Sequence, residues 1–99
     1  MVNVLIRHTV EDYERWKPYF DDHAGVRAEG GERGYRLFRT FEDPNEVVIL
    51  FEWDTGDNAR AFLESEDLRE RMHEAGVLGT PEVAILDELE AKTAGEPVA

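Results

Sequence analysis

Two of the predicted strands are apolar on both faces, and this feature constrains the fold more than any other. Residues 47–51 read Val-Val-Ile-Leu-Phe and residues 83–86 read Val-Ala-Ile-Leu, whereas a strand with one solvated face alternates apolar and polar side chains. A sheet of such strands needs cover on both sides, because an exposed apolar patch of that size is unusual for a monomer. A chain of 99 residues forms one domain, and its helices are expected to cover only one face.

Four segments rich in β-branched and aromatic residues have the character of strands. They are residues 2–8, 34–41, 46–53 and 83–89. Helical spacing of apolar residues predicts helices between the first two strands and between the last two, ending near Gly30 and Gly76. Pro18 lies within the first helical region and is expected to kink it or to open its second half. Residues 79–81 (Gly-Thr-Pro) predict a turn before the last strand.

The order β-α-β-β-α-β predicts an α+β, ferredoxin-like fold, with a four-stranded antiparallel sheet and helices on one face. We expect residues 1–90 to form this single domain and residues 91–99, which mix Gly, Pro and small side chains, to form a flexible C-terminal tail. The other sheet face carries roughly six to eight apolar side chains, each worth ~1.5–3 kcal/mol when buried. The tail is too short to cover them, so the sequence predicts a homodimer that pairs two sheet faces.

The charge of the chain excludes several classes of partner. It has 23 acidic and 11 basic residues, with a net charge of −12, so nucleic acid and anionic membranes are poor partners. Lys17 and Lys92 are the only lysines, as in proteins of salt-loving organisms; an ordinary acidic protein is the alternative. The absence of cysteine excludes disulfides and thiolate chemistry. No apolar run approaches ~18 residues and the N-terminus lacks a signal-peptide pattern, so we expect a cytoplasmic protein.

Short motifs along residues 2–90 resemble the dimeric α+β barrel superfamily, in particular its antibiotic-biosynthesis-monooxygenase-like and "cyclase"-labelled small members. The motifs are His8-Thr9-Val10, Asp12-Tyr13, Trp16-Lys17-Pro18, Leu37-Phe38-Arg39, Asp43-Pro44-Asn45-Glu46, Phe51-Glu52-Trp53-Asp54 and Ala59-Arg60-Ala61-Phe62. The resemblance implies a dimeric barrel with a pocket between sheet and helices. Characterised members include cofactor-independent oxygenases of polycyclic aromatic substrates and heme-degrading oxygenases, although the fold alone does not define the reaction.

Two histidines are candidate catalytic residues. His8 ends the first predicted strand and His23 follows Phe20 by three residues in the first helix, so that they can face one pocket. Two such histidines can act as base and orienting group towards an enolisable substrate. The alternative is that His8 bonds a helix terminus and that His23 is half exposed at the surface. His73, next to Met72, is expected to face solvent.

Arg39 is the third candidate catalytic residue, with the role of stabilising an enolate or carboxylate. It shares the parity of Tyr35 and Leu37. If that parity faces inward, the guanidinium needs a partner such as Glu52, Asp87 or an anionic ligand. Aromatic side chains can wall a pocket for a flat apolar molecule, with ordinary core packing as the alternative. The ligand-binding candidates are Trp16, Phe20, Phe38 and Trp53.

No cofactor is expected. The histidine positions match no compact metal-ligand motif, and the sequence has no phosphate loop or nucleotide fingerprint. Heme-degrading relatives pair a first-strand asparagine with a tryptophan and a ligand histidine; Asn3 and His73 fall near the matching places, but Phe62 stands where the tryptophan is expected. The sequence therefore predicts a homodimer that binds a small apolar or aromatic, polyketide-like molecule. It is either a cofactor-independent monooxygenase or cyclase-like enzyme, or a non-enzymatic ligand-binding or stress-related protein.

Overall fold

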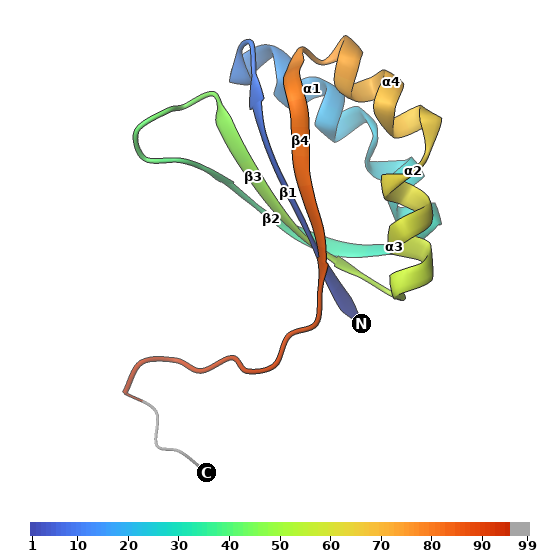
Figure 1. The fold of residues 1–99 in the computed structure, drawn as a ribbon, viewed down its shortest axis with the longest axis vertical. Helices are drawn as coiled ribbons and strands as arrows, with labels where there is room; N and C mark the ends of the chain where they lie inside the picture. Colours follow the sequence, from blue (N-terminus) through green and yellow to red (C-terminus); the bar gives the residue numbers. More distant parts are fainter. Residues whose placement is uncertain (96–99) are drawn as a thin grey trace.

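In the computed structural model, which describes residues 1–95, the chain folds into four strands and four helices (Figure 1). The strands are β1 (Val2–Val10), β2 (Glu32–Arg39), β3 (Glu46–Trp53) and β4 (Val77–Leu86). The helices are α1 (Tyr13–Asp22), α2 (Ala24–Gly30), α3 (Gly56–Leu63) and α4 (Glu66–Glu74). All strand pairs are antiparallel, in the order β2-β3-β1-β4. The predicted α+β, ferredoxin-like fold is confirmed.

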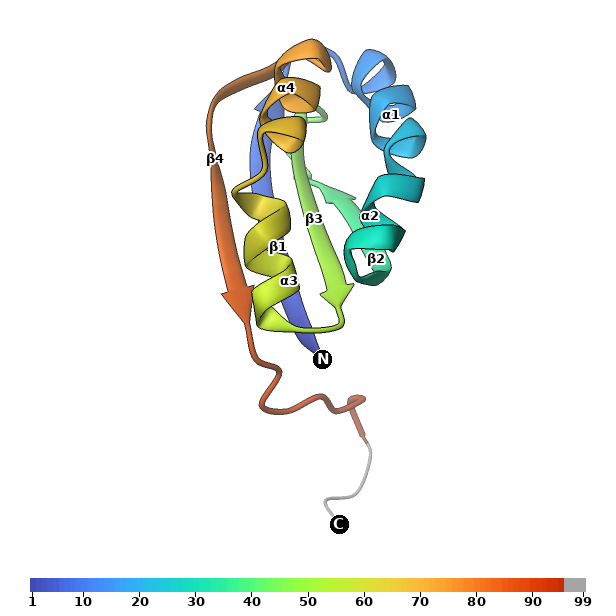
Figure 2. The same ribbon diagram turned by 90° about the vertical axis from the view of Figure 1, so that its right-hand side faces the viewer.

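The helices cover one face of the sheet, as the side view in Figure 2 shows. Successive side chains of a strand point to opposite faces, and in β1 and β3 every second side chain is buried towards the helices. These side chains are Val4, Ile6, His8 and Val10 in β1 and Val47, Ile49, Phe51 and Trp53 in β3. Their apolar members form one core with Trp16 and Phe20 of α1 and Phe62 of α3.

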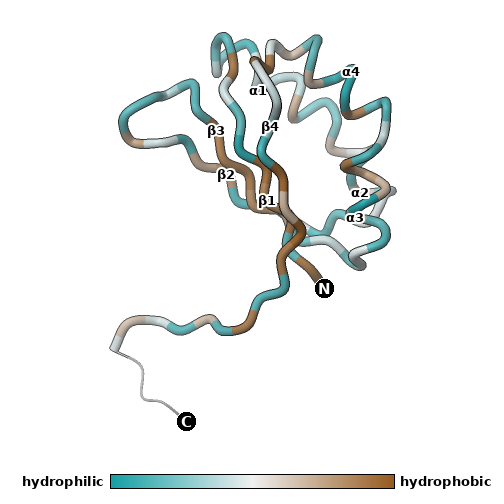
Figure 3. The backbone as a smooth tube through the Cα atoms, in the orientation of Figure 1, coloured by the Kyte–Doolittle hydropathy of each residue, from teal (hydrophilic) through white to brown (hydrophobic). Residues whose placement is uncertain are grey.

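The opposite face, here called the open face, has no helix of residues 1–95 on it (Figure 1). Leu5, Val48 and Leu50 are only partly buried there, and Phe38 and Leu86 are 47% and 40% exposed. The middle of the strands is accordingly coloured as hydrophobic in Figure 3. The prediction that the helices cover only one sheet face is confirmed.

The first helical region is interrupted at His23 and not at Pro18. Helix α1 continues through Pro18, which lies in its interior and removes one hydrogen bond without ending the helix. The two helices meet at His23, which is both the C-cap of α1 and the N-cap of α2. The interruption places His23 at a junction between two helices.

The last strand begins earlier than predicted, and residues 79–81 lie inside it and do not form a separate turn. β4 is an edge strand, where the missing N–H of Pro81 can face away from the neighbouring strand. The pairing register between β1 and β4 shifts between Arg7 and Thr9, which accommodates the irregular backbone. Residues 87–95 contain no helix or strand and run away from the sheet (Figure 1). The remainder of the predicted tail, residues 96–99, lies outside the described residues.

Candidate functional site

A cavity lies between the covered face of the sheet and the helices. It is lined by Ile6, His8, Trp16, Tyr19, Phe20, His23, Arg27, Ile49, Phe51, Phe62, Leu68, Arg71, Met72 and Ala75. The space between these side chains is about 410 Å³ when the part open to solvent is included, and the centre of a water molecule can reach about 40 Å³ of it. The cavity is therefore narrow, and a ring system can enter only if side chains at its mouth move.

His8 projects from β1 into the space under the helices. The residue is 5% exposed, and its ring meets the edge of Trp16 with 5.6 Å between centroids. Its Nδ1 is buried and has no hydrogen-bond partner among the described residues. Burial lowers the pKa of His8 from 6.5 to about 4, because the imidazolium would lose its hydration. His8 is neutral at pH 7, and it bonds no helix terminus, contrary to the alternative prediction.

His23 is held at the cavity wall by a carboxylate. The residue is 4% exposed, and its Nε2 lies 2.6 Å from Oδ2 of Asp67. Asp67 lies in the first turn of α4, which Ser65 caps by accepting a hydrogen bond from the N–H of Leu68. A carboxylate on one imidazole nitrogen fixes the tautomer and stabilises the protonated ring. His23 is therefore not the half-exposed surface residue of the alternative prediction.

Arg27 also lines the cavity and was not selected from the sequence. It is 2% exposed; its Nε donates to Oε1 of Glu32 at 2.6 Å, and its Nη1 donates to the carbonyl oxygen of Phe20 at 2.7 Å. Its guanidinium carbon lies 4.0 Å from the centroid of the Phe20 ring, a favourable cation–π geometry. The spacing of Phe20, His23 and Arg27 along one helical stripe is the signal that identifies it.

Aromatic rings make up much of the wall. Trp16 and Phe20, both predicted to bind ligand, line the cavity and stack with 5.0 Å between centroids. Phe51 and Phe62 continue the wall, 6.0 Å apart and nearly perpendicular. Such a surface suits a flat apolar molecule.

Two predicted site residues lie away from this cavity. Arg39 is at the end of the edge strand β2, exposed, with its guanidinium carbon 5.0 Å from the Tyr13 ring centroid. It is on the side of the sheet that carries the helices but is not buried, so the expected internal partner Glu52, which is on the open face, is not needed. Phe38 is on the open face, next to Arg36.

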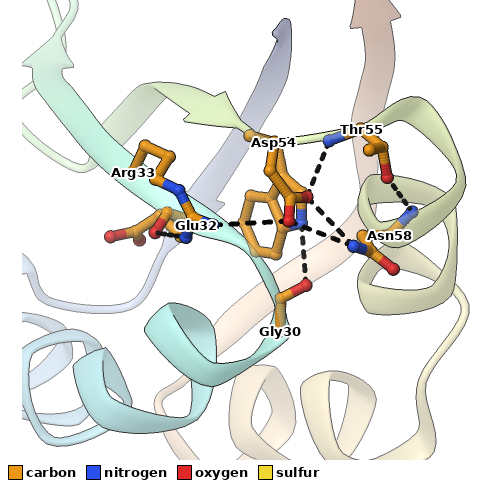
Figure 4. A network of polar contacts seen from close by, with 7 residues as sticks. Gly30, Glu32, Arg33, Asp54, Thr55 and Asn58 are labelled. Carbon is orange, nitrogen blue, oxygen red and sulfur yellow. Dashed lines mark hydrogen bonds and ion pairs between the residues drawn. The ribbon is translucent and has the colours of Figure 1, made fainter.

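Trp53 is fully buried in the core, behind the cavity wall. Its ring stacks on Phe62 with 4.6 Å between centroids, and its Nε1 donates to the carbonyl oxygen of Gly30 at 3.3 Å (Figure 4). The next residue, Gly31, has φ 126°, and a Cβ there would lie 2.8 Å from Trp53 Nε1, so glycine is required. Trp53 therefore shapes the cavity through Phe62 and Phe51, whose rings it contacts.

Asp54 completes the network of Figure 4, at the start of α3. Its carboxylate accepts hydrogen bonds from the side chain of Asn58 and the backbone N–H of Thr55. The bond from Asn58, followed by the bond from Thr55, lowers the pKa of Asp54. The network fixes the turn between β3 and α3 and lies outside the cavity.

The heme arrangement of the heme-degrading relatives does not fit these residues. Phe62 lines the cavity, but Asn3 is on the open face of the sheet and His73 is exposed on α4, so the three residues do not share one pocket. Within residues 1–95, no group of three His, Cys, Asp or Glu side chains is placed to hold a metal ion. None of the helices in that part of the chain has the length and apolar character of a membrane span.

Solved structures with this arrangement are similar over nearly the whole chain. A protein from Bordetella bronchiseptica described as an antibiotic biosynthesis monooxygenase has a TM-score of 0.74 at 18% identity and covers 90% of this chain and 97% of its own. SnoaB, a cofactor-independent oxygenase from Streptomyces nogalater, has a TM-score of 0.70 at 21% identity, with 96% and 97% covered. Rv0793 from Mycobacterium tuberculosis has a TM-score of 0.68 at 18% identity, with 93% and 98% covered. These similarities define the fold class alone, a ferredoxin-like α+β chain.

The family follows from the sequence itself. The model of the antibiotic biosynthesis monooxygenase family matches residues 1–74, which include β1, α1, α2, β2, β3, α3 and α4. The chain therefore belongs to this family. No curated protein sequence matches it.

Proposed function

We propose that this protein is a cofactor-independent oxygenase that acts on a small planar aromatic substrate in the cavity between sheet and helices. The observation that carries the proposal is the buried His23, which lies in a wall of aromatic rings with its Nε2 2.6 Å from the carboxylate of the exposed Asp67. Similarity to SnoaB, whose description names the same type of oxygenase, supports it. Neither the histidine–carboxylate pair nor the similarity to SnoaB identifies the substrate, which the experiment below tests.

His23 is the proton acceptor in this proposal. Asp67 accepts a hydrogen bond from Nε2–H, which leaves Nδ1 to take a proton from an activated CH₂ group of the substrate. His8 stays neutral and is available for a hydrogen bond to a substrate oxygen. The resulting carbanion is delocalised over the aromatic rings, and His23 becomes an imidazolium stabilised by Asp67.

Molecular oxygen is the oxidant and the only co-reactant. The carbanion is oxidised as its carbon forms a bond to O₂, and the peroxide takes back the proton held by His23. Loss of water from the hydroperoxide leaves a ketone. One oxygen atom enters the product and the other leaves as water, so the substrate supplies the electrons that a cofactor supplies in other oxygenases.

We also propose that a second copy covers the open face. Its apolar centre contains Leu5, Phe38, Val48 and Leu50, which no described helix covers. Charged side chains of both signs surround that centre, and a two-fold pairing can bring unlike charges together. They are Arg7, Arg36, Glu52 and Glu82. Dimerisation would leave the cavity, which is on the other side of the sheet, free for ligand.

Anthrone, a planar tricyclic ketone with an acidic CH₂ group, is a suitable test substrate. We expect the wild-type protein to consume one O₂ for each anthrone and to form the quinone faster than a protein-free blank at pH 7. His23→Asn removes the proton acceptor and is expected to lower kcat by about 10²–10⁴-fold. His73→Asn, the same change at an exposed position of α4, should leave kcat unchanged.

A wild-type rate no faster than the blank, or an unchanged rate in His23→Asn, would overturn the oxygenase proposal. Binding of anthrone without turnover, measured by quenching of tryptophan fluorescence, would identify a non-enzymatic ligand-binding protein instead.

A further inference from the structure

The cavity has the opposite charge character to the rest of the chain. The protein has 23 acidic and 11 basic residues, yet no aspartate or glutamate is among the described residues that line the cavity. Its lining contains two arginines, Arg27 and Arg71, and two histidines, His8 and His23. Although the chain has about twice as many acidic as basic residues, the described lining of the cavity contains basic side chains and no carboxylate.

Arg27 is at the inner end of this basic set. At 2% exposure, its guanidinium is removed from water, where electrostatic interactions are strongest. Its carboxylate partner Glu32 bonds Nε but is not part of the cavity lining. The ion pair therefore has its positive member at the cavity and its negative member behind it.

Arg71 repeats this arrangement at the mouth. Its side chain is 34% exposed, and its Nη1 lies 3.4 Å from Oδ2 of Asp22, an exposed residue that does not line the cavity. Asp67 likewise bonds His23 without lining the cavity. Three carboxylates thus lie outside three basic groups, and all three pairs point their positive ends inward.

We infer that the cavity selects a planar aromatic molecule that carries a carboxylate. The rings contact Trp16 and Phe20, and the carboxylate lies near Arg71 and Arg27. A carboxylate fits this site better than a neutral phenol, because it is ionised at pH 7 and can accept hydrogen bonds from the guanidinium N–H groups that Glu32, Phe20 and Asp22 leave free on Arg27 and Arg71. This inference names the substrate class of the site and rests on the proposed function for its pocket.

Three probes of nearly equal shape separate charge from shape. They are 2-naphthoate, 2-naphthamide and 2-naphthylmethylammonium. Binding is measured by tryptophan quenching and by calorimetry at pH 7 in 0.15 M salt, where the long-range repulsion from the acidic surface is screened beyond about 8 Å. We expect the carboxylate to bind at least about tenfold more tightly than the amide, and the ammonium to bind most weakly.

Variants assign the preference to the arginines. Arg71→Met should weaken 2-naphthoate about tenfold and leave 2-naphthamide unchanged, because only the charge contact is lost. Arg60→Met, the same charge change on the exposed surface of α3, is the matched control and should change neither affinity. Arg27→Met combined with Glu32→Gln removes the inner charge without leaving a buried carboxylate unpaired. If circular dichroism shows that this double variant does not fold, the affinities of Arg71→Met for 2-naphthoate and 2-naphthamide test the inference by themselves.

Equal affinity for 2-naphthoate and 2-naphthamide, failure of all three probes to bind, or a preference that survives in Arg71→Met would each overturn the inference. Anthrone turnover is read in the same preparations. Turnover of anthrone without a preference for the carboxylate probe overturns this inference and leaves the proposed function standing. A preference for the carboxylate probe without turnover overturns the proposed function and leaves the charge selectivity of the cavity standing.

Discussion

The covered and the open face belong to the same four strands but differ in whether their polar side chains are buried. On the covered side, three polar side chains are buried under the helices: His8 comes from the sheet, Arg27 from α2 and His23 from the junction between α1 and α2. On the open face, the charged residues are exposed and surround an apolar centre. They are Arg7, Arg36, Glu52 and Glu82.

The difference follows from how each face is covered. Helices of the same chain can hold a polar side chain at a fixed position and give it a partner, as α4 does for His23 through Asp67. On the open face, which no described helix covers, the charged side chains stay in water and need no buried partner. The covered face is thus suited to chemistry and the open face to assembly, and four predictions test that division.

The largest expected effect is on assembly. Leu50→Lys puts a charge at the centre of the open face, and each of the two lysines of a dimer would lose its hydration at about 3–5 kcal/mol. We expect light scattering to report a dimeric mass for the wild type and a monomeric mass for the variant, with unchanged circular dichroism. Leu89→Lys, at a residue 95% exposed beyond β4, should remain dimeric. A dimeric Leu50→Lys would show that the open face is not the interface.

The next effect concerns the covered face alone. Phe51→Ala removes a side chain that is 1% exposed and contacts Phe20, Trp53 and Phe62, so the free energy of unfolding should fall by about 3–5 kcal/mol. Urea unfolding at fixed protein concentration measures it. Phe41→Ala, at a fully exposed phenylalanine, should change the free energy by less than about 0.5 kcal/mol. Similar losses in both variants would contradict the placement of the core.

Acid should destabilise the covered face through His8. Its pKa is about 4 in the folded protein and 6.5 when exposed, so below pH 6.5 the unfolded chain binds a proton that the folded chain does not. Stability is therefore complete above pH 6.5 and is lost as the pH falls towards 4, by about 2–3 kcal/mol. We expect His8→Leu to lose that much less stability than the wild type between pH 7 and pH 4.5. The matched variant His73→Leu should keep the wild-type pH dependence, and identical losses in all three would refute a buried neutral His8.

The smallest effect tests how the helices hold the site. Ser65→Ala removes the hydroxyl that caps α4 and should lower the free energy of unfolding by about 1 kcal/mol. Ser65→Thr keeps a capping hydroxyl and should restore most of it. If the cap also positions Asp67, anthrone turnover falls in Ser65→Ala and recovers in Ser65→Thr; unchanged turnover in both would limit Ser65 to stability.

The sequence predicted the fold because apolar spacing alone separates strands from helices here. The sequence also predicted that His8 and His23 can face one pocket, because strand parity and position along a helix follow from the local pattern of residues. Phe38 could not be assigned to a face in the same way, because its strand offers apolar side chains at both parities. Arg39 has the right parity but lies exposed at the end of an edge strand, where it contacts Tyr13 at the start of α1 and does not line the cavity.

Partners that come from distant segments were not predictable. Asp67 meets His23 across 44 residues, and nothing in the sequence of α4 distinguishes Asp67 from its acidic neighbours. Arg27 shares a helix face with Phe20 and His23 by spacing, but it was not chosen as a site residue because a charged residue in a helix is usually solvated. Tertiary packing shows that this one is enclosed by Phe20 and Glu32. His23 lines the cavity, but its role as a site residue stays a prediction, and its partner Asp67 could not be named from the sequence.

The narrowness of the cavity has a kinetic consequence. The centre of a water molecule can reach only about 40 Å³ of the cavity, so we expect a fused ring system to enter after Tyr19, Arg71 and Met72, the lining side chains that are not buried, have moved aside. Binding then follows two steps in sequence, and its observed rate levels off at high ligand concentration, at the frequency with which the gap forms. Stopped-flow mixing would measure the rate of this opening. The opening rate sets an upper limit on kcat, however fast the chemical step is.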